Sequence, residues 1–228
     1  MKITAILFSS ILLALPGYGQ NRETDYLSHV LEKMNAVESV TYHCVIKSWE
    51  PGDKEPVYNV PIEIYEHVNP QDTAVGYSFL CASDKEFRQP LWVYDGTVFA
   101  YIEKEEKEVR IDDFTQKSSL PFRVIMPQAF GCMKSVLEYA LNTQDSIVLS
   151  LKDEGKDYLM ELSIHTPYQV EFFGKACYMP QNPYVYDPTS IYKIWISKED
   201  DMPFRYRREM QHSISEGICS DFVYNPAG

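Results

Sequence analysis

The sequence predicts an α+β fold, in which a large curved antiparallel sheet or an incompletely closed β-barrel is covered by two or three helices. Two observations lead to this prediction. Roughly nine to eleven short runs alternate apolar and polar residues between turns rich in Pro, Gly, Asn and Asp, which is the pattern of strands with one wet face. Two other stretches, 24–40 and 121–142, have helical spacing or dense apolar content. Because nearly every strand has one apolar face, a single sheet would place those faces on one side.

The first residues predict a secretory signal peptide. Lys2 gives a short positive start, 3–15 is almost wholly apolar, and small residues precede a cleavage site after Gly19. The apolar run is roughly 13 residues long, whereas a bilayer span needs ~20, so a membrane anchor is the less favoured interpretation. We therefore expect removal of residues 1–19, a single domain over 20–228, and a protein that is periplasmic or otherwise exported and soluble.

The first elements of the mature chain are a helix and a pair of strands. Apolar side chains recur at helical spacing over 24–40, and Thr24 is placed to cap that helix. The period then changes to two, so that 40–47 and 58–64 predict an antiparallel strand pair. Pro61 cannot donate a ladder hydrogen bond, which indicates a sheet edge or a bulge at that point.

A meander continues from there. The run 75–81 predicts a third strand, and 88–94 and 97–103 flank the dipeptide Asp95-Gly96. Asp-Gly between two β-rich runs predicts a hairpin with a type I′ turn, because that turn requires positive φ at both central residues. We interpret this turn as structural and not as part of a site. A further strand is expected at 108–114.

The middle of the chain interrupts the strand pattern. Apolar residues over 121–142 are too dense for alternation and predict one or two helices, broken at Pro127 or Gly131. A loop is expected from about Gly174 to Ser190, where Pro and Tyr are frequent. Strands are predicted on either side of that loop, at 147–151, 158–164, 192–196, 204–210 and 214–224.

Composition narrows the function classes. The formal net charge of −12 predicts repulsion by nucleic acid and by anionic membranes. The five Cys are far apart with no Cys-x-x-Cys, and their odd number leaves at least one thiol outside any internal pairing. The His residues lack zinc-ligand spacing, so neither a metal nor a cofactor is expected. Arg205, Arg207 and Arg208 are interpreted as partners for the surplus acid, with an anionic headgroup site as the alternative.

No catalytic motif is present in the sequence. It contains no G-x-S-x-G, no H-E-x-x-H and no phosphate-binding loop. We therefore predict a protein that is not an enzyme, and a hydrolase of unrecognised type is the weakest of the alternatives.

Four segments carry a resemblance to a known family. The helix that runs into a strand at 30–40, the hairpin at 92–99, the central helices and the strand–turn element at 194–205 follow one another in a familiar order. This order resembles the LolA/LolB-like periplasmic lipoprotein-carrier superfamily, and also the N-terminal domain of exported thioredoxin-like (TlpA-type) proteins. The chain departs from the family pattern at Met202, where Leu is usual. No residue with which the family holds a lipoprotein can be matched to a position in this sequence.

The resemblance implies an open β-barrel with a helical lid that binds an acyl chain or a similar apolar ligand. Aromatic and aliphatic side chains on predicted strands are the candidate ligand-binding residues, and the alternative is that they fill an ordinary core. The candidates are Tyr77, Phe79, Trp92, Tyr94, Tyr192, Ile194 and Tyr206.

The predicted function is therefore that of an exported, non-catalytic binding protein, a carrier or sensor in the periplasm. Its predicted partner is a lipid or the acyl chain of a lipoprotein, and no nucleic acid is expected. The alternative is an interaction domain that docks a protein partner, such as a redox protein of the cell envelope. A ligand carrier requires an internal cavity, whereas an interaction domain requires an exposed apolar patch and no cavity.

Overall fold

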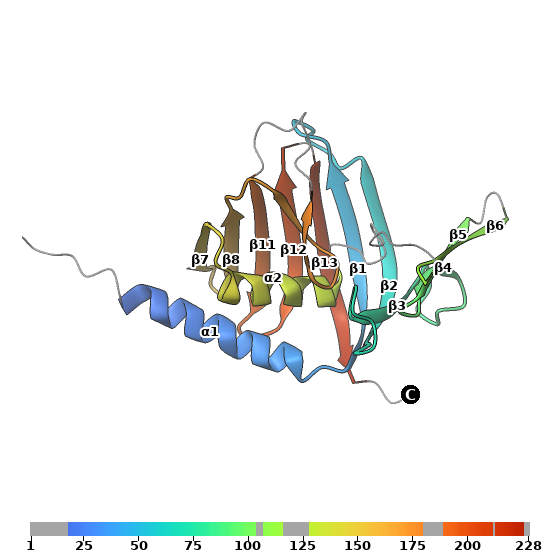
Figure 1. The fold of residues 1–228 in the computed structure, drawn as a ribbon, viewed down its shortest axis with the longest axis horizontal. Helices are drawn as coiled ribbons and strands as arrows, with labels where there is room; N and C mark the ends of the chain where they lie inside the picture. The colour runs from blue at the N-terminus through green and yellow to red at the C-terminus, as the bar shows by residue number, and fades with distance from the viewer. Residues whose placement is uncertain (1–17, 104–106, 116–127, 180–188, 212, 226–228) are drawn as a thin grey trace, which may run out of the picture.

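The computed structural model describes residues 18–103, 107–115, 128–179, 189–211 and 213–225. In these residues the chain forms two helices and thirteen strands, and eleven of the strands make one antiparallel sheet (Figure 1). The sheet begins and ends on different strands and does not close. The prediction of a large, unclosed antiparallel sheet with helices is confirmed.

The N-terminal half of the chain is one helix followed by a meander. The helix α1 spans Tyr18–Asn35. The six strands after it pair in sequence order, each with its neighbour. They are β1 (Ser39–Trp49), β2 (Tyr58–Val68), β3 (Tyr77–Ala82), β4 (Pro90–Tyr94), β5 (Val98–Glu103) and β6 (Glu108–Asp113).

The C-terminal half begins with α2, which spans Phe130–Asn142. Two of its seven strands, β9 (Gln169–Phe172) and β10 (Ala176–Met179), form a separate two-stranded sheet. The other strands are β7 (Ile147–Asp153), β8 (Asp157–Ile164), β11 (Ser190–Ser197), β12 (Pro203–Met210) and β13 (Ser213–Tyr224).

The two halves meet at a single strand pair in the main sheet. The strand order is β6-β5-β4-β3-β2-β1-β13-β12-β11-β8-β7, so β1 and β13 are the only neighbours in it that come from different halves. They pair antiparallel over most of their length, from Val40 opposite Tyr224 to Trp49 opposite Ile214. We call this β1–β13 pair the seam.

Both helices lie on the same face of the sheet, which we call the core face (Figure 1). The apolar stripe of α1 is fully buried there, with Leu27, Val30 and Met34 at 0% exposure. The inward side chains of the strands alternate with outward ones, as in Ser190–Ser197, whose burial alternates residue by residue. One hydrophobic cluster joins α1, α2, the core face and the β9–β10 hairpin.

A buried carboxylate on the sheet caps α2. Ala129, the N-cap residue, makes no side-chain capping bond. Instead Glu66 of β2, 1% exposed, accepts hydrogen bonds from the backbone N–H of Phe130 (2.7 Å) and of Gly131 (2.9 Å). The hydroxyl of Tyr42 also donates to Glu66. The carboxylate therefore satisfies the first free donors of the helix and attaches α2 to the sheet.

The helix predictions are partly corrected. The first helix begins at Tyr18, so Thr24 lies inside it and is not its cap; the Thr24 carbonyl accepts a hydrogen bond from the Ser28 hydroxyl at 2.8 Å. Gly131 lies in the first turn of α2 and does not break it. Its place has a steric reason, since a Cβ there would lie 2.7 Å from the Tyr77 ring. Residues 116–127, with Pro127, lie outside the described residues.

One detail of the strand predictions also changes, and two others are confirmed. The expected loop from Gly174 to Ser190 contains β10, and residues 180–188 lie outside the described part. Pro61 does not cause a bulge in the β1–β2 ladder, but β3 pairs with β2 only from Glu63 onward, so Pro61 lies on a locally unpaired edge of β2. The Asp95-Gly96 hairpin forms as expected, with Tyr94 opposite Phe99.

The hairpin turn is not of type I′. Gly96 has φ +105°, but neither Asp95 nor Thr97 has positive φ. The Asp95 backbone N–H donates to the Val98 carbonyl, so Gly96 and Thr97 are the central residues. The Asp95 carboxylate accepts from the N–H groups of Thr97 (2.8 Å) and Val98 (2.7 Å), and these bonds lower its pKa. Asp95 acts here as a turn residue, as interpreted from the sequence.

Gly96→Val is expected to lower the free energy of unfolding by about 1 kcal/mol or more. A β-branched residue resists positive φ, and a Cβ at this position would lie 2.3 Å from Nδ2 of Asn69, which itself donates to the Asp95 carbonyl. Urea unfolding of the two proteins measures the difference. A variant as stable as the wild type would contradict the role given to this turn.

Candidate functional site

The structure separates the seven predicted ligand-binding residues into two groups on the core face. Tyr192, Ile194 and Tyr206 lie beneath the helices and are at most 1% exposed. The Tyr192 hydroxyl donates to the Val170 carbonyl at 2.6 Å, and its ring meets the Phe172 ring edge-on at 5.0 Å. These three side chains are packed by α2 and the β9–β10 hairpin, which is the arrangement of a filled core.

The second group lies on β3 and β4, at the other end of the sheet. Tyr77 and Phe79 are buried, and Phe79 lies directly opposite Tyr94 in the ladder. Tyr94 in turn lies opposite Phe99 of β5, and the next core-facing pair is Trp92 opposite Tyr101. Cross-strand partners point to the same face, so these aromatic residues form a continuous surface on the core face.

We call this surface the aromatic end, and its rings form two groups of contacting side chains. The Phe79 ring lies 5.8 Å from that of Tyr94 and 6.4 Å from that of Phe99, and Trp92 stacks on Tyr101 at 6.0 Å. Phe114, just after β6, meets Tyr94 edge-on at 6.3 Å. The members of the aromatic end are Phe79, Trp92, Tyr94, Phe99, Tyr101 and Phe114.

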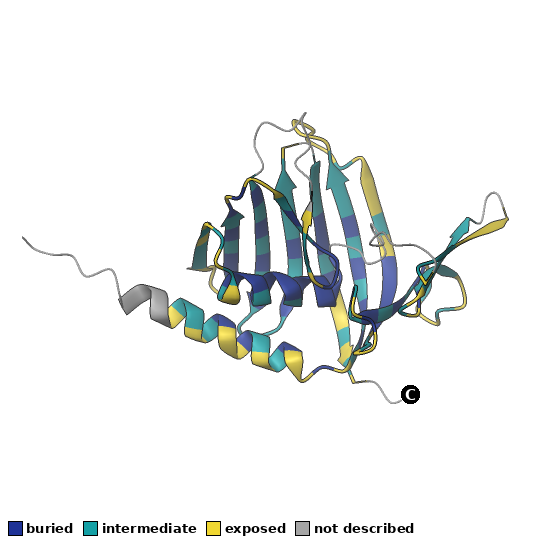
Figure 2. Cartoon of the chain, viewed as in Figure 1, coloured by how far each residue is buried: buried dark blue, intermediate teal, exposed yellow. Residues whose placement is uncertain are grey.

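Exposure rises along the aromatic end. Phe79 and Tyr94 are 4% and 2% exposed, whereas Trp92, Phe99 and Tyr101 are of intermediate exposure. Figure 1 shows the reason: α2 crosses the sheet in front of the strands from β8 to β13, α1 runs below it along the lower ends of these strands, and β4–β6 extend beyond both helices. In Figure 2 these outer strands are coloured as intermediate and exposed, while the strands under α2 carry buried positions. The sheet therefore offers partly exposed aromatic rings beside its closed core.

Polar groups border the aromatic end. Asp72 is 8% exposed and accepts from the Tyr94 hydroxyl at 3.0 Å and from the backbone N–H groups of Ala74 and Val75. Burial of Tyr94, together with the Asp72 carboxylate, raises the pKa of its phenol well above the ordinary value. Tyr94 is thus a buried ring fixed by its hydroxyl, and the partly exposed rings of Phe99 and Tyr101 on the neighbouring strand are the ones open to further contacts.

A buried ion pair lies on the core face under the β9–β10 hairpin. The Arg208 Nη1 lies 3.1 Å from Oε2 of Glu171, and both side chains are less than 20% exposed. The Nε of Arg208 and the hydroxyl of Ser215, which lies opposite it in the ladder, are buried without a hydrogen-bond partner. Glu171 and neighbouring phenols raise the pKa of Arg208 against the effect of burial, so the guanidinium stays charged.

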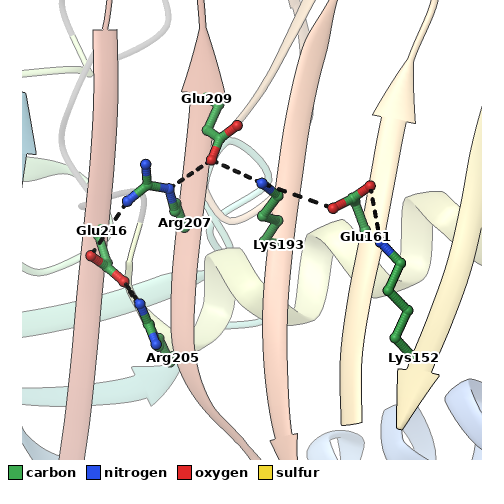
Figure 3. Close-up of polar contacts among 7 residues, drawn as sticks. All are labelled: Lys152, Glu161, Lys193, Arg205, Arg207, Glu209 and Glu216. Atoms are coloured by element: carbon green, nitrogen blue, oxygen red, sulfur yellow. Dashed lines mark hydrogen bonds and ion pairs between the residues drawn. The ribbon is translucent and has the colours of Figure 1, made fainter. Parts of the chain in front are cut away.

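The other two clustered arginines, Arg205 and Arg207, lie on the outer face of the sheet. Arg205 forms an ion pair with Glu216, and Arg207 forms one with Glu209 at 2.7 Å (Figure 3). Figure 3 shows the chain of contacts continuing through Lys193 toward β8. All three arginines are therefore paired with acidic side chains, which confirms the interpretation made from the sequence.

Sequence reasoning did not select Phe99, Tyr101 or Phe114. The signal for the first two was present, because the Asp95-Gly96 turn sets the ladder that places Phe99 opposite Tyr94 and Tyr101 opposite Trp92. Phe114 follows β6 in a turn, where alternation gives no face. Ile194 was selected for its alternation alone, and that pattern cannot separate a filled core from an open surface.

In the residues that the structure describes, no group of three or more His, Cys, Asp or Glu side chains is arranged to hold a metal ion. Neither of the described helices is long and apolar enough to cross a membrane.

Comparison with known proteins gives matches to solved structures alone, since no protein-family model and no curated protein matches the chain. Lipoprotein LppX from Mycobacterium tuberculosis is similar at 8% identity, over 92% of this chain and 99% of that one, with a TM-score of 0.44. LprF from Mycobacterium bovis is similar at 9% identity, over 91% and 95%, with a TM-score of 0.45. A LolA superfamily protein from Nitrosomonas europaea is similar at 9% identity, over 89% and 94%, with a TM-score of 0.31.

Proposed function

We propose that this protein is an exported, non-catalytic binding protein for an apolar ligand of the lipid or acyl-chain type, acting as a carrier or sensor in the periplasm. The observation that supports the proposal most directly is the aromatic end, where partly exposed rings continue the core face beyond the helices. The free energy falls when a ligand covers apolar surface of this kind and removes it from water.

The position of the rings favours a long, narrow ligand. Trp92 and Tyr101 form one core-facing row, which continues to the buried Cys81, and Tyr94 and Phe99 form the next, which continues to the buried Phe79. A ligand lying along these rows would reach the edge of the helix-covered core without displacing Tyr192 or Ile194. Export rests on the signal peptide expected at residues 1–19, nearly all of which lies outside the described residues.

Binding of brominated fatty acids should quench the fluorescence of Trp92. Affinity is expected to climb with chain length, by up to about fifteenfold for every two methylenes, because each buried methylene contributes ~0.8 kcal/mol. The Trp92→Phe variant should lose the quenching. Trp195→Phe should keep it, because Trp195 lies on the outer face under the Arg205 guanidinium, 4.1 Å away.

Two variants, each with a carboxylate on a different face of β5, test which face binds the ligand. Phe99→Asp on the aromatic end should weaken binding at least tenfold, because it would set a carboxylate against the acyl chain. Ala100→Asp is the matched control, since Ala100 is the next residue, also of intermediate exposure, and faces the opposite side with Ile111. No quenching at any chain length, or equal loss in the two variants, would reject the carrier proposal.

One observation favours the alternative of a protein-docking domain. On the outer face of β6, an edge strand of the sheet, Val109 and Ile111 are 57% and 66% exposed. Ile111 continues a row of apolar side chains through Ala100, Val93 and Leu80. An interaction domain would use this outer surface, for example to dock an envelope redox protein, and Ala100→Asp would then impair it while Phe99→Asp would not.

A further inference from the structure

The seam contains two thiols in contact. Cys44 of β1 and Cys219 of β13 are directly opposite each other in the antiparallel ladder. Their Sγ atoms lie 3.0 Å apart, with the Cys219 thiol donating to Cys44. Directly opposed residues in antiparallel strands have Cα atoms about 4.5–5.5 Å apart, which lies within the range that disulfides span.

We infer that Cys44 and Cys219 form a disulfide when the chain folds in an oxidising environment. A disulfide needs its two sulfur atoms about 2.05 Å apart, so closure requires a movement of about 1 Å from the observed contact. The Cβ atoms of opposed residues on one face already point the same way. Backbone rearrangement of β1 or β13 is therefore not needed.

The chemistry is thiol–disulfide exchange with a disulfide oxidant, such as oxidised glutathione or the active-site disulfide of an oxidase. One cysteine thiolate attacks the oxidant, forms a mixed disulfide and releases one thiolate. The second cysteine thiolate then attacks the mixed disulfide and releases the other. The two protein thiols lose two protons and two electrons, and the oxidant is reduced to two thiols.

Burial determines when this exchange takes place. Cys44 is 0% exposed and Cys219 is 4% exposed in the folded protein. Burial also raises the pKa of Cys219 well above its ordinary value, which reduces the thiolate needed for attack. Exchange is therefore expected during folding, before the seam is covered by α2, and the finished bond would be protected from reductants.

The position gives the bond a structural consequence. The two cysteines are 175 positions apart, and the seam is where the two halves of the main sheet join. A cross-link there closes most of the chain into one loop and restricts the unfolded state strongly. The other three cysteines are placed differently. Cys81 lies on β3, which is separated from β1 by β2. Cys132 donates to the Phe172 carbonyl at 3.3 Å, and Cys177 lies near the Lys175 carbonyl.

Refolding the reduced full chain in a mixture of oxidised and reduced glutathione tests the inference. The protein is then unfolded in guanidinium chloride with iodoacetamide and digested, and the masses of the peptides are measured by mass spectrometry. The expected product joins the Cys44 and Cys219 peptides, while Cys81, Cys132 and Cys177 carry the alkyl group. Because the oxidant is supplied in the tube, the result does not depend on export or on ligand binding.

Thermal unfolding supplies a second measurement. Protein refolded from denaturant with reductant alone is expected to have a Tm about 10 °C below that of the oxidised protein. Cys44→Ala and Cys219→Ala should each remove this dependence on reductant. Cys81→Ala, a substitution at an equally buried thiol, should keep it. Alkylation of all five cysteines, a bond between another pair, or an unchanged response to reductant in Cys44→Ala would each overturn the inference.

Discussion

Glu66→Ala is expected to lower the free energy of unfolding by about 3 kcal/mol. The substitution removes the acceptor of two backbone N–H groups at the start of α2 and of the Tyr42 hydroxyl. These donors are buried, so they would lose their hydrogen bonds without gaining water, and the side chain would leave a cavity. Equilibrium unfolding in urea measures the change.

Glu63→Ala is the matched control for this prediction. Glu63 lies three residues earlier on β2 and is also buried, but it faces the outer side and pairs with His43 at 2.8 Å. Its loss disturbs one hydrogen bond to a histidine and no helix end, so a cost of about 1 kcal/mol or less is expected. If Glu66→Ala cost no more than Glu63→Ala, the sheet carboxylate would not be holding α2.

The same carboxylate predicts a pH dependence with a defined sign. Burial raises the pKa of Glu66 above its ordinary value of 4.5, although hydrogen bonds from Tyr42, Gly131 and Phe130 oppose the shift. As pH rises from 4.5 toward the folded-state pKa, the unfolded chain loses this proton before the folded chain does. The stability of the wild type relative to Glu66→Gln should therefore fall over that window and be level on either side.

The local pattern was sufficient to predict most of the strands. Runs such as 192–196 and 158–164 alternate because one face packs on helices and the other meets water, and this alternation is visible in the sequence. The strands β9 and β10 were not predicted because each has four residues, too few to show an alternation of apolar and polar side chains. Their stability comes from contacts with α2, such as that between Phe172 and Tyr139.

No local sequence pattern predicts which distant strands pair with each other. Nothing in the period of 40–47 or 214–224 states that these two segments pair, yet their pairing brings Cys44 and Cys219 together. The role of Glu66 could not be predicted either, because an acidic residue on an alternating strand indicates a solvated position. Of the seven candidate residues, Trp92 and Tyr94 lie in the aromatic end together with Phe79, whereas Ile194 lies in the filled core.

Gly174→Ala is expected to lower the free energy of unfolding by about 3 kcal/mol, from two additive causes. Gly174 lies in the turn between β9 and β10 with φ +81°, where any Cβ is strained. A Cβ there would also lie 2.2 Å from the backbone carbonyl oxygen of Val75, and backbone cannot move aside as a flexible side chain can. The Gly174 carbonyl accepts from the Ser135 hydroxyl of α2, so the turn has little freedom to shift.

Gly155→Ala separates these two causes. Gly155 has a nearly equal φ of +84°, but nothing lies within 4 Å of the position of its Cβ. It should therefore show the backbone strain alone, at about 1 kcal/mol. The excess cost of Gly174→Ala measures how tightly the β9–β10 hairpin is held against the β2–β3 loop, where Lys175 also donates to the Thr73 carbonyl at 2.7 Å. Equal costs for the two variants would mean that the hairpin is free to move away from Val75.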